Sequence, residues 1–345
     1  MFKRGLVIGK FYPPHRGHKH LIDTASMQCE QLTVIMCSTK NEWIPGDMRE
    51  KWLRHIHPKV DVRHMKDILL GDNDSSGWAK FTLEYLGYVP DAVFTSEDYG
   101  DPYAHHMGTV HVCVDKARAK VPISGTLVRS NPFKYLSYLE PCVRAHFVKH
   151  ICVVGAESTG TTTLAKDLAK YYRTAWVPEF GRLYSEGKLH AGIEAQWRTE
   201  EFITIARAQN DLEEALTGSS NGVLICDTDA FATSVWHERY MGSRSTEVEK
   251  IAKHIHHDFY ILRGDEIPFE QDGTRDGEHI RRWMHHRFEE RLIEENKRFI
   301  VVRGDRDERL RKAAQEIEIL LEGSSATGFG SVVEKKETAR QLAER

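Results

Sequence analysis

The chain has 345 residues, 40% of them hydrophobic, and a formal net charge of −3. This length predicts two or three domains with ordinary apolar cores. The balanced charge argues against a dominant nucleic-acid-binding surface. We find no apolar run long enough for a signal peptide or a membrane span, so we expect a cytoplasmic protein. The six scattered cysteines are typical of buried free thiols in a reducing compartment.

Short apolar runs alternate with amphipathic stretches along the first half of the chain. The predicted strands are residues 6–9, 32–37, 60–64, 92–95 and 110–114. A helix is expected between the first two strands, from residue 18 to about residue 30. This βαβ rhythm is typical of a doubly wound parallel sheet.

A second series of the same kind starts at residues 150–155 and is followed by a helix at 164–172. Its later strands are predicted at 222–227, 259–263 and 299–303. We therefore expect an α/β protein with two doubly wound domains, residues 1–147 and 148–322. Residues 323–345 combine small and charged residues, and we predict a disordered tail.

The most informative motif lies where the first strand ends, in the run GLVIGKFYPPHRGH at residues 5–18. It places His15 and His18 at the start of a helix, where backbone N–H groups and the helix dipole favour an anion. Two imidazoles three residues apart can reach neighbouring oxygens of one polyphosphate. The alternatives are a surface turn or a zinc pair, which needs more ligands than the nearby sequence supplies. We predict a nucleotide-phosphate site.

A second motif, ISGTLVR at residues 123–129, is expected close to the end of the first domain. Ser124 is placed to cap a short helix. Arg129 lies one turn later, and its planar, permanently charged guanidinium suits triphosphate oxygens. Together, the two motifs resemble those of the nucleotidylyltransferase superfamily, which has His/Thr-x-Gly-His after its first strand and Ile-Ser-x-Thr-x-x-Arg later.

The second domain opens with GAESTGTTT at residues 155–163, between a predicted strand and a predicted helix. Its glycine spacing is that of a phosphate-binding loop, with Thr162 at the Mg²⁺ ligand position. Thr161 stands where such loops carry a lysine. Because the backbone cradle needs no side chain, we expect nucleotide binding to survive, and catalysis to suffer from the lost charge. The predicted nucleotide contacts of this loop are Gly155, Ser158, Gly160, Thr161, Thr162 and Thr163.

Two carboxylates follow the strand at 222–227. We expect Asp227 to hold Mg²⁺ and Asp229 to bind or deprotonate a substrate hydroxyl; the alternative for either is to cap the helix that begins near residue 230. A basic segment with Arg275, Arg281 and Arg282 is interpreted as a lid that closes over a phosphoryl group, with surface charge as the alternative. Arg275 is the lid residue we assign to the nucleotide.

The two halves in this order resemble the NadR-type bifunctional proteins, which join nicotinamide mononucleotide (NMN) adenylyltransferase to ribosylnicotinamide kinase. The resemblance covers residues 1–322. It is carried by the motifs above, by Thr-Ser-Glu at 95–97, by Asn-Pro-Phe at 131–133 and by Glu-Phe-Gly-Arg at 179–182. Repressor members carry a helix-turn-helix domain before the first strand; this chain begins at that strand, so we expect no DNA partner.

The resemblance implies that the first domain transfers AMP from ATP to NMN, which gives NAD⁺ and pyrophosphate. It implies a nucleotide and Mg²⁺ surrounded by Lys10, His15, His18 and Arg129, with further contacts from Gly9, Phe11, Ser124 and Thr126. Trp78 is expected to stack on the cationic nicotinamide ring, or else to be half-buried core. Glu97 is expected to contact adenosine, or else merely to end a strand.

For the second domain, the resemblance implies that ATP phosphorylates the 5′-hydroxyl of nicotinamide riboside. Glu179 and Arg182 would face that substrate, or form a structural ion pair. Rival hypotheses are a kinase-like domain that senses nucleotides, a non-catalytic regulator that binds NAD⁺ or ATP, and a transferase acting on phosphopantetheine or glycerol phosphate. We expect small-molecule substrates, no membrane partner, and leave homo-oligomer formation open.

Overall fold

The computed structural model describes residues 1–66, 70–71, 73–190, 196–270 and 278–326. These residues form two compact units, Met1–His146 and Phe147–Gly323, which we describe separately. No helix in the described ranges is long and apolar enough to cross a membrane.

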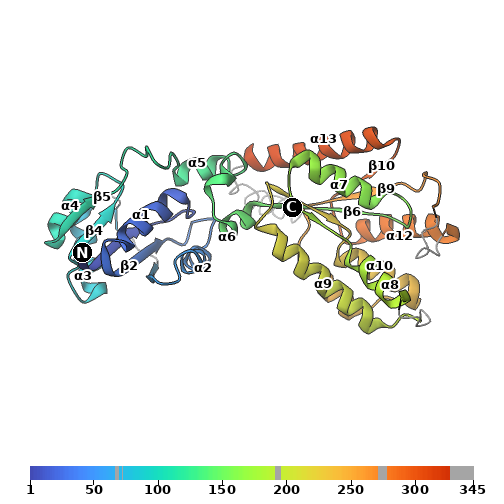
Figure 1. Cartoon of the computed structure of the whole chain (residues 1–345), viewed down its shortest axis with the longest axis horizontal. Helices are drawn as coiled ribbons and strands as arrows, with labels where there is room; N and C mark the ends of the chain where they lie inside the picture. Colours follow the sequence, from blue (N-terminus) through green and yellow to red (C-terminus); the bar gives the residue numbers. More distant parts are fainter. Residues whose placement is uncertain (67–69, 72, 191–195, 271–277, 327–345) are drawn as a thin grey trace, which may run out of the picture. The chain divides into compact units, whose positions relative to one another are not determined.

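The N-terminal unit is built on a five-stranded parallel sheet in the order β3-β2-β1-β4-β5 (Figure 1). Its strands are β1 (Phe2–Gly9), β2 (Cys29–Ser38), β3 (Asp61–Lys66), β4 (Ala92–Thr95) and β5 (Val110–Cys113). The connecting helices are α1 (Arg16–Ser26), α2 (Gly46–Ile56), α3 (Ser75–Leu86) and α4 (Gly100–Met107). After β5 come α5 (Gly125–Ser130), η1 (Phe133–Tyr138), α6 (Pro141–Arg144) and η2 (Ala145–Phe147).

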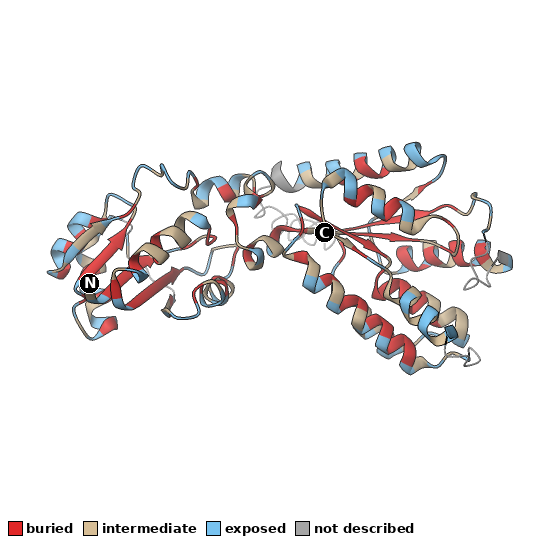
Figure 2. Cartoon of the chain, viewed as in Figure 1, coloured by how far each residue is buried: buried red, intermediate tan, exposed pale blue. Residues whose placement is uncertain are grey.

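Successive side chains of β1 point to opposite faces of the sheet, and each face is covered by a different pair of helices. Val7 packs in one core cluster with residues of α1 and α2. Leu6 and Ile8 point to the opposite face and pack with residues of α3 and α4. Because side chains alternate along a strand, one apolar run supplies both cores, and the central strands β1, β2 and β4 are buried on both faces (Figure 2).

The C-terminal unit contains a second five-stranded parallel sheet, in the order β10-β9-β6-β8-β7. Its strands are β6 (Lys149–Val154), β7 (Trp176–Val177), β8 (Val223–Asp227), β9 (Phe259–Arg263) and β10 (Phe299–Val302). Its helices are α7 (Thr161–Tyr172), α8 (Phe180–His190), α9 (Thr199–Thr217), α10 (Ala230–Met241), α11 (Thr246–Ala252), η3 (Glu278–Ile280), α12 (Arg281–Glu294) and α13 (Arg306–Ala326). Helices α7 and α13 pack on one face of the sheet, and α10 and α12 on the other.

The predicted fold class, two doubly wound parallel sheets, is confirmed. Several predicted boundaries are wrong. The first helix spans residues 16–26 instead of 18–30, because β2 already pairs with β1 from residue 29 onward. The helix predicted at 164–172 begins at Thr161, directly after left-handed Gly160. A second strand was expected before Glu179 without bounds, because β7 is only two residues long and gives no periodic pattern.

The tail prediction is wrong at its start, because α13 continues to residue 326, past the predicted end at 322. Residues 327–345 lie outside the described residues, as does Arg275 of the predicted lid.

Each sheet reverses its strand order at the first strand of its unit. Strand β1 lies between β2 and β4, and β6 lies between β8 and β9. In open parallel sheets, ligands bind beyond the carboxyl ends of the strands at such a reversal. The segments that follow β1 and β6, where the two phosphate motifs stand, are therefore the places to look for sites.

Candidate active sites

The N-terminal unit has a cavity of about 710 Å³ beyond the carboxyl ends of β1 and β4. Every residue that the sequence assigned to a site in this unit lies on its wall: Gly9, Lys10, Phe11, His15, His18, Trp78, Glu97, Ser124, Thr126 and Arg129. The two motifs, more than a hundred positions apart in sequence, thus share one cavity. Phe11, in the turn after β1, has a φ of 44°, a conformation that non-glycine residues adopt only under local constraint.

His15 and His18 are held in a defined arrangement at the start of α1. His15 is the N-cap of this helix, and its Nδ1 accepts a hydrogen bond of 3.3 Å from the backbone N–H of His18. The two rings stack with centroids 3.7 Å apart and planes 16° apart. Because Nδ1 of His15 is an acceptor, a neutral His15 ring carries its proton on Nε2. That proton is available to a ligand oxygen.

Both imidazoles are neutral at physiological pH. Burial, aided by the nearby Arg118 guanidinium, lowers the pKa of His15 from 6.5 to about 4. Burial also lowers the pKa of His18 well below 6.5, and the charges of His15 and Arg118 act in the same direction. The histidines therefore offer hydrogen-bond donors, and fixed positive charge must come from Lys10, Arg118 and Arg129 on the cavity wall.

Arg129 is positioned by α5 and by the turn after β1. The predicted cap is confirmed, since Ser124 Oγ accepts from Leu127 N at 3.2 Å. Arg129 donates from Nη1 to the carbonyl of Tyr12 and from Nη2 to Thr126 Oγ1 at 3.1 Å, and its guanidinium lies 4.6 Å from the centroid of the Tyr12 ring. A Cβ at Gly125 would lie only 2.6 Å from that carbonyl, so the close approach requires glycine.

Two further arginines of this site were not assigned from the sequence. Arg49 of α2 is fully buried; it donates to the carbonyl of Lys10 at 2.5 Å and pairs with Glu42. It thereby fixes the turn that carries Lys10. Arg118 lines the cavity and pairs with Glu97 at 2.8 Å. Nothing local marks Arg49, whereas Arg118 stands in the Val-Asp-x-x-Arg run at 114–118 that follows β5.

Trp78 is half-buried against the core, as one of the two alternatives expected, and stacking on the nicotinamide ring stays a prediction. Its ring packs partly buried against the core cluster of α3 and α4, and it also forms part of the cavity wall. Its Nε1 donates to the carbonyl of Gly71 at 3.0 Å. This bond fixes the orientation of the indole ring against the cavity.

The C-terminal unit has a smaller cavity, of about 210 Å³, around the loop after β6. The predicted residues on its wall are Gly155, Ser158, Gly160, Thr161, Thr162, Thr163, Glu179 and Arg182. Ser158 and Gly160 have φ angles of 56° and 78°, which turn the backbone between β6 and α7. The loop thus ends at the N-terminus of a twelve-residue helix, a favourable position for phosphate.

Two buried arginines that lie outside the cavity hold this loop in place by hydrogen bonds to its backbone carbonyls. Arg263 of β9 donates from Nε and Nη2 to the carbonyl of Thr159, at 3.0 and 2.7 Å. Arg281 donates to the carbonyls of Ser158 and Ile267, at 3.3 and 2.8 Å. Arg281 was predicted as part of a lid; this is corrected, because its guanidinium is buried against loop carbonyls. Arg282 is exposed.

Asp227 ends β8 behind the phosphate loop. Burial raises the pKa of its carboxyl from 3.8 to about 6, an effect opposed by hydrogen bonds from Thr162 and Thr161 and by the charge of Arg182. Its Oδ1 has no hydrogen-bond partner in the described part of the chain. The buried Asp227 Oδ1, which lacks a hydrogen-bond partner among the described residues, and the neighbouring Thr162 hydroxyl oxygen are together a pair of oxygen ligands that suits Mg²⁺.

The catalytic role predicted for Asp229 is corrected. Asp229 is the N-cap of α10, where Oδ1 accepts from Ala232 N at 2.8 Å, and Oδ2 accepts from the Tyr260 hydroxyl at 2.7 Å. Like Asp227 it is buried and is not on the cavity wall, but both of its carboxylate oxygens already accept hydrogen bonds. Asp229 therefore has the role that was considered as its alternative, the N-cap of the helix that begins at Ala230. Its direction differs from that of Asp227 because Thr228 between them has a φ of 67°.

Glu179 and Arg182 lie on the cavity wall at the start of α8, and Arg182 Nη1 lies 3.8 Å from Glu186 Oε1. An aromatic wall opposite the loop was missed. It consists of Trp197, Phe202, Trp236 and Tyr240. Phe202 lies in α9, Trp236 and Tyr240 lie in α10, and Trp197 precedes α9; in sequence, such aromatic residues are indistinguishable from core residues.

The raised pKa of Asp227 has a consequence for stability. Between pH 4 and 6 the folded state binds more protons than the unfolded state, so stability falls as pH rises through this window. Asp227→Asn removes the buried charge. The variant should therefore be more stable than the parent by about 1–3 kcal/mol above pH 7.

Urea unfolding at pH 7.5 and pH 4 measures this difference, which should vanish at the lower pH. Asp211→Asn, which changes an exposed carboxylate on α9, should alter stability by less than about 0.5 kcal/mol at either pH. A loss of stability in Asp227→Asn at pH 7.5 would contradict the pKa assignment.

Comparisons with known proteins give relatives that span both units. Residues 150–309 match a family described as AAA domain. The trifunctional NAD biosynthesis/regulator protein NadR of Escherichia coli K12 is 30% identical over 300 residues, which cover 79% of this chain and 71% of that protein. The protein of the same name from Salmonella typhimurium LT2 is 29% identical over 297 residues, with the same coverage.

Solved structures extend the likeness in fold. A crystal structure of NadR in complex with NR superimposes with a TM-score of 0.74 at 20% identity, over 91% of this chain and 95% of that one. Another, in complex with NAD and AMP-PNP, gives 0.70 at 20% identity, over 89% and 92%. Given its identity to the Escherichia coli protein over more than two thirds of that protein's length, the chain belongs to the NadR family.

Proposed function

We propose that the N-terminal unit transfers AMP from ATP to NMN, which yields NAD⁺ and pyrophosphate, and that the C-terminal unit phosphorylates nicotinamide riboside to NMN. The observation that carries the first half is the convergence of His15, His18, Lys10 and Arg129 on one cavity. Support for both halves comes from relatives named as NAD biosynthesis proteins, and from NadR structures that hold NR, or NAD and AMP-PNP. The product of one unit is then the substrate of the other.

In the adenylyl transfer, the 5′-phosphate of NMN attacks the α-phosphorus of ATP, and the bond to pyrophosphate breaks. No protein nucleophile is required, since positioning and charge stabilisation supply the catalysis. The Nε2–H of His15, which is buried, and the ring of His18, which is half-buried, donate hydrogen bonds to phosphate oxygens. Lys10 and Arg129 balance the charge that develops on the leaving pyrophosphate.

Trp78 and Glu97 complete the proposed substrate site. Trp78 offers a ring whose face is held by its hydrogen bond to Gly71, and the nicotinamide ring of NMN carries a positive charge. Glu97 lies on the cavity wall near the carboxyl end of β4 and is the proposed contact for adenosine. Its ion-pair partner Arg118 lies on the same wall.

In the kinase reaction, the 5′-hydroxyl of the riboside attacks the γ-phosphorus of ATP. The loop amides and the N-terminus of α7 would hold the phosphates, and Thr162 and Asp227 would hold Mg²⁺, which neutralises phosphate charge when bound. The aromatic wall suits a flat aromatic ring such as that of the nicotinamide group, which can pack against these side chains. Glu179 and Arg182 are the proposed polar contacts of the riboside.

Thr161 supports a second candidate, in which the C-terminal unit binds nucleotide as a sensor and phosphorylates slowly. The charges of Arg263 and Arg281 are directed at loop carbonyls, and so do not substitute for the lysine. Arg309 of α13 is better placed, because its Nη1 would lie 3.7 Å from a Cβ on Gly160. We propose that Arg309 supplies only part of the charge that the lysine would give to the phosphates.

His18→Ala should lower the rate of NAD⁺ formation from NMN and ATP by about 10²–10³-fold, because a positioned donor to the transferring phosphate is lost. Product formation is followed by chromatography. His55→Ala, on the exposed side of α2, is the matched control and should retain the parent rate. Unchanged turnover in His18→Ala, with the fold intact by circular dichroism, would contradict the phosphate-binding role.

Thr161→Lys should raise the rate of NMN formation from nicotinamide riboside by about tenfold, which corresponds to about 1.4 kcal/mol of transition-state stabilisation. The physical reason is the added charge at the β- and γ-phosphates. Thr204→Lys, which adds the same charge on the exposed face of α9, should leave the rate unchanged. A lower rate in Thr161→Lys would mean that the site is rebuilt around threonine.

A further inference from the structure

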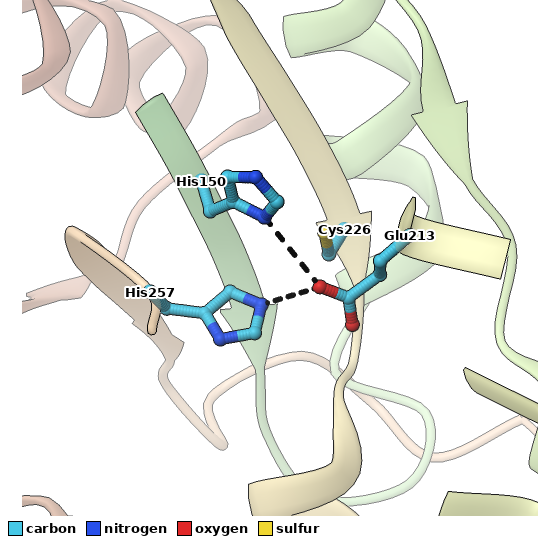
Figure 3. Close-up of side chains that lie close together, drawn as sticks. All are labelled: His150, Glu213, Cys226 and His257. Atoms are coloured by element: carbon cyan, nitrogen blue, oxygen red, sulfur yellow. Dashed lines mark ion pairs between the residues drawn. The ribbon is translucent and has the colours of Figure 1, made fainter. Parts of the chain in front are cut away.

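Four side chains with metal-ligating atoms converge in the C-terminal unit, outside both cavities: His150, Glu213, Cys226 and His257 (Figure 3). They come from β6, α9, β8 and the segment before β9. One ligand atom of each lies within 4.8 Å of the ligand atoms of the other three. Figure 3 shows the two rings and the thiol gathered around the carboxylate.

The cluster is buried and poorly satisfied by hydrogen bonds. The side chains of Glu213 and His257 are 0% and 2% exposed, and Cys226 is fully buried. His257 Nε2 and His150 Nδ1 lie 2.9 and 3.7 Å from Glu213 Oε2. Within the described ranges, neither oxygen of Glu213 nor either ring nitrogen of His257 has a well-directed hydrogen bond. Buried polar groups left in this state call for a further partner.

The second nitrogen of His257 is held by a carboxylate. Nδ1 of His257 lies 3.3 Å from Asp229 Oδ2, and that oxygen also accepts the Tyr260 hydroxyl at 2.7 Å. The cap of α10 fixes Asp229 itself. This contact turns Nε2 of His257 toward Glu213. Metal-bound histidines are typically oriented in this way, by a carboxylate at the other ring nitrogen.

We propose that His150, Glu213, Cys226 and His257 bind one divalent transition-metal ion, zinc by the chemistry of the donors. A thiolate, two imidazoles and a carboxylate form a four-ligand set that Zn²⁺ accepts with tetrahedral geometry, and the thiolate disfavours Mg²⁺ and Ca²⁺. Zinc–ligand distances of 2.0–2.3 Å correspond to ligand–ligand separations of roughly 3.3–3.8 Å. The observed separations, from 2.9 Å to at most 4.8 Å, require only small side-chain adjustments.

The proposed site is structural, because all four tetrahedral positions are filled by protein and no position is left for substrate. Binding releases the thiol proton of Cys226 to solvent, along with any proton bound at the ring nitrogens that become ligands. The ion would join β6, β8, α9 and the start of β9. Cys226 directly precedes Asp227, so the metal would fix the end of the strand that carries the proposed Mg²⁺ ligand.

The test uses the full-length protein, stripped of metal by a chelator and titrated with Co²⁺. We expect uptake of one ion per chain, with the intense visible bands of tetrahedral Co²⁺ and a thiolate-to-cobalt charge-transfer band in the near ultraviolet. Added Zn²⁺ should abolish these bands. Cys226→Ser should lose the charge-transfer band. Cys152→Ser decides between the two buried thiols, because Cys152 is the register partner of Cys226 and forms an overlapping group of possible ligands with Asp229 and His257; it should keep the band.

His150→Ala serves if Cys226→Ser fails to fold, since His150 is the least buried member of the cluster. Its affinity for Zn²⁺, measured by competition with a chromophoric chelator, should fall at least tenfold. The proposal is overturned if the protein takes up no stoichiometric metal, if the band persists in Cys226→Ser, or if it is lost in Cys152→Ser. An absence of uptake would leave the cluster as a buried ion-pair network of His257 with Glu213 and Asp229.

Discussion

The reversal of strand order at β1 and at β6 is the constraint on which the rest of this structure depends. In each parallel sheet, the strands on either side of the first strand are connected in opposite directions, so the chain leaves an opening only beyond that strand's carboxyl end. Both phosphate motifs stand at these openings, and both lead into helix N-termini. The two proposed reactions therefore use the same backbone feature on two different sheets.

The two openings differ in which ionisable groups are buried beside them. Around the first, burial keeps His15 and His18 neutral, and the surrounding arginines provide the positive potential. Around the second opening, the guanidinium groups of Arg263 and Arg281 donate hydrogen bonds to backbone carbonyls and so hold the phosphate loop in place. Burial there raises the pKa of Asp227. A buried carboxylate that destabilises the fold near neutral pH is typical of a residue retained for binding a cation.

The features that could be predicted from the sequence are those that depend on a few neighbouring residues of the chain. The turn with His15 and His18, the cap at Ser124 and the loop at 155–163 each depend on a few neighbouring residues, and the structure has them at the expected strand ends. Arg49 could not be predicted, because its role depends on the carbonyl of Lys10, which is 39 positions away.

Asp229 was misassigned for a related reason. Two residues after Asp227 along an extended strand, its side chain would face the same way, but the left-handed backbone at Thr228 turns it to the opposite side. The cluster of His150, Glu213, Cys226 and His257 spans 107 positions and has no motif spacing, so only the assembled sheet brings it together.

The most direct test of the account is a paired assay of the unmodified protein with ATP and Mg²⁺. One arm receives NMN and the other receives nicotinamide riboside, and the products are separated by chromatography. We expect NAD⁺ from both arms, with NMN as the intermediate in the second. NAD⁺ from NMN alone would leave the C-terminal unit as a sensor or as a kinase for another substrate, and an absence of NAD⁺ in both arms would contradict the central claim.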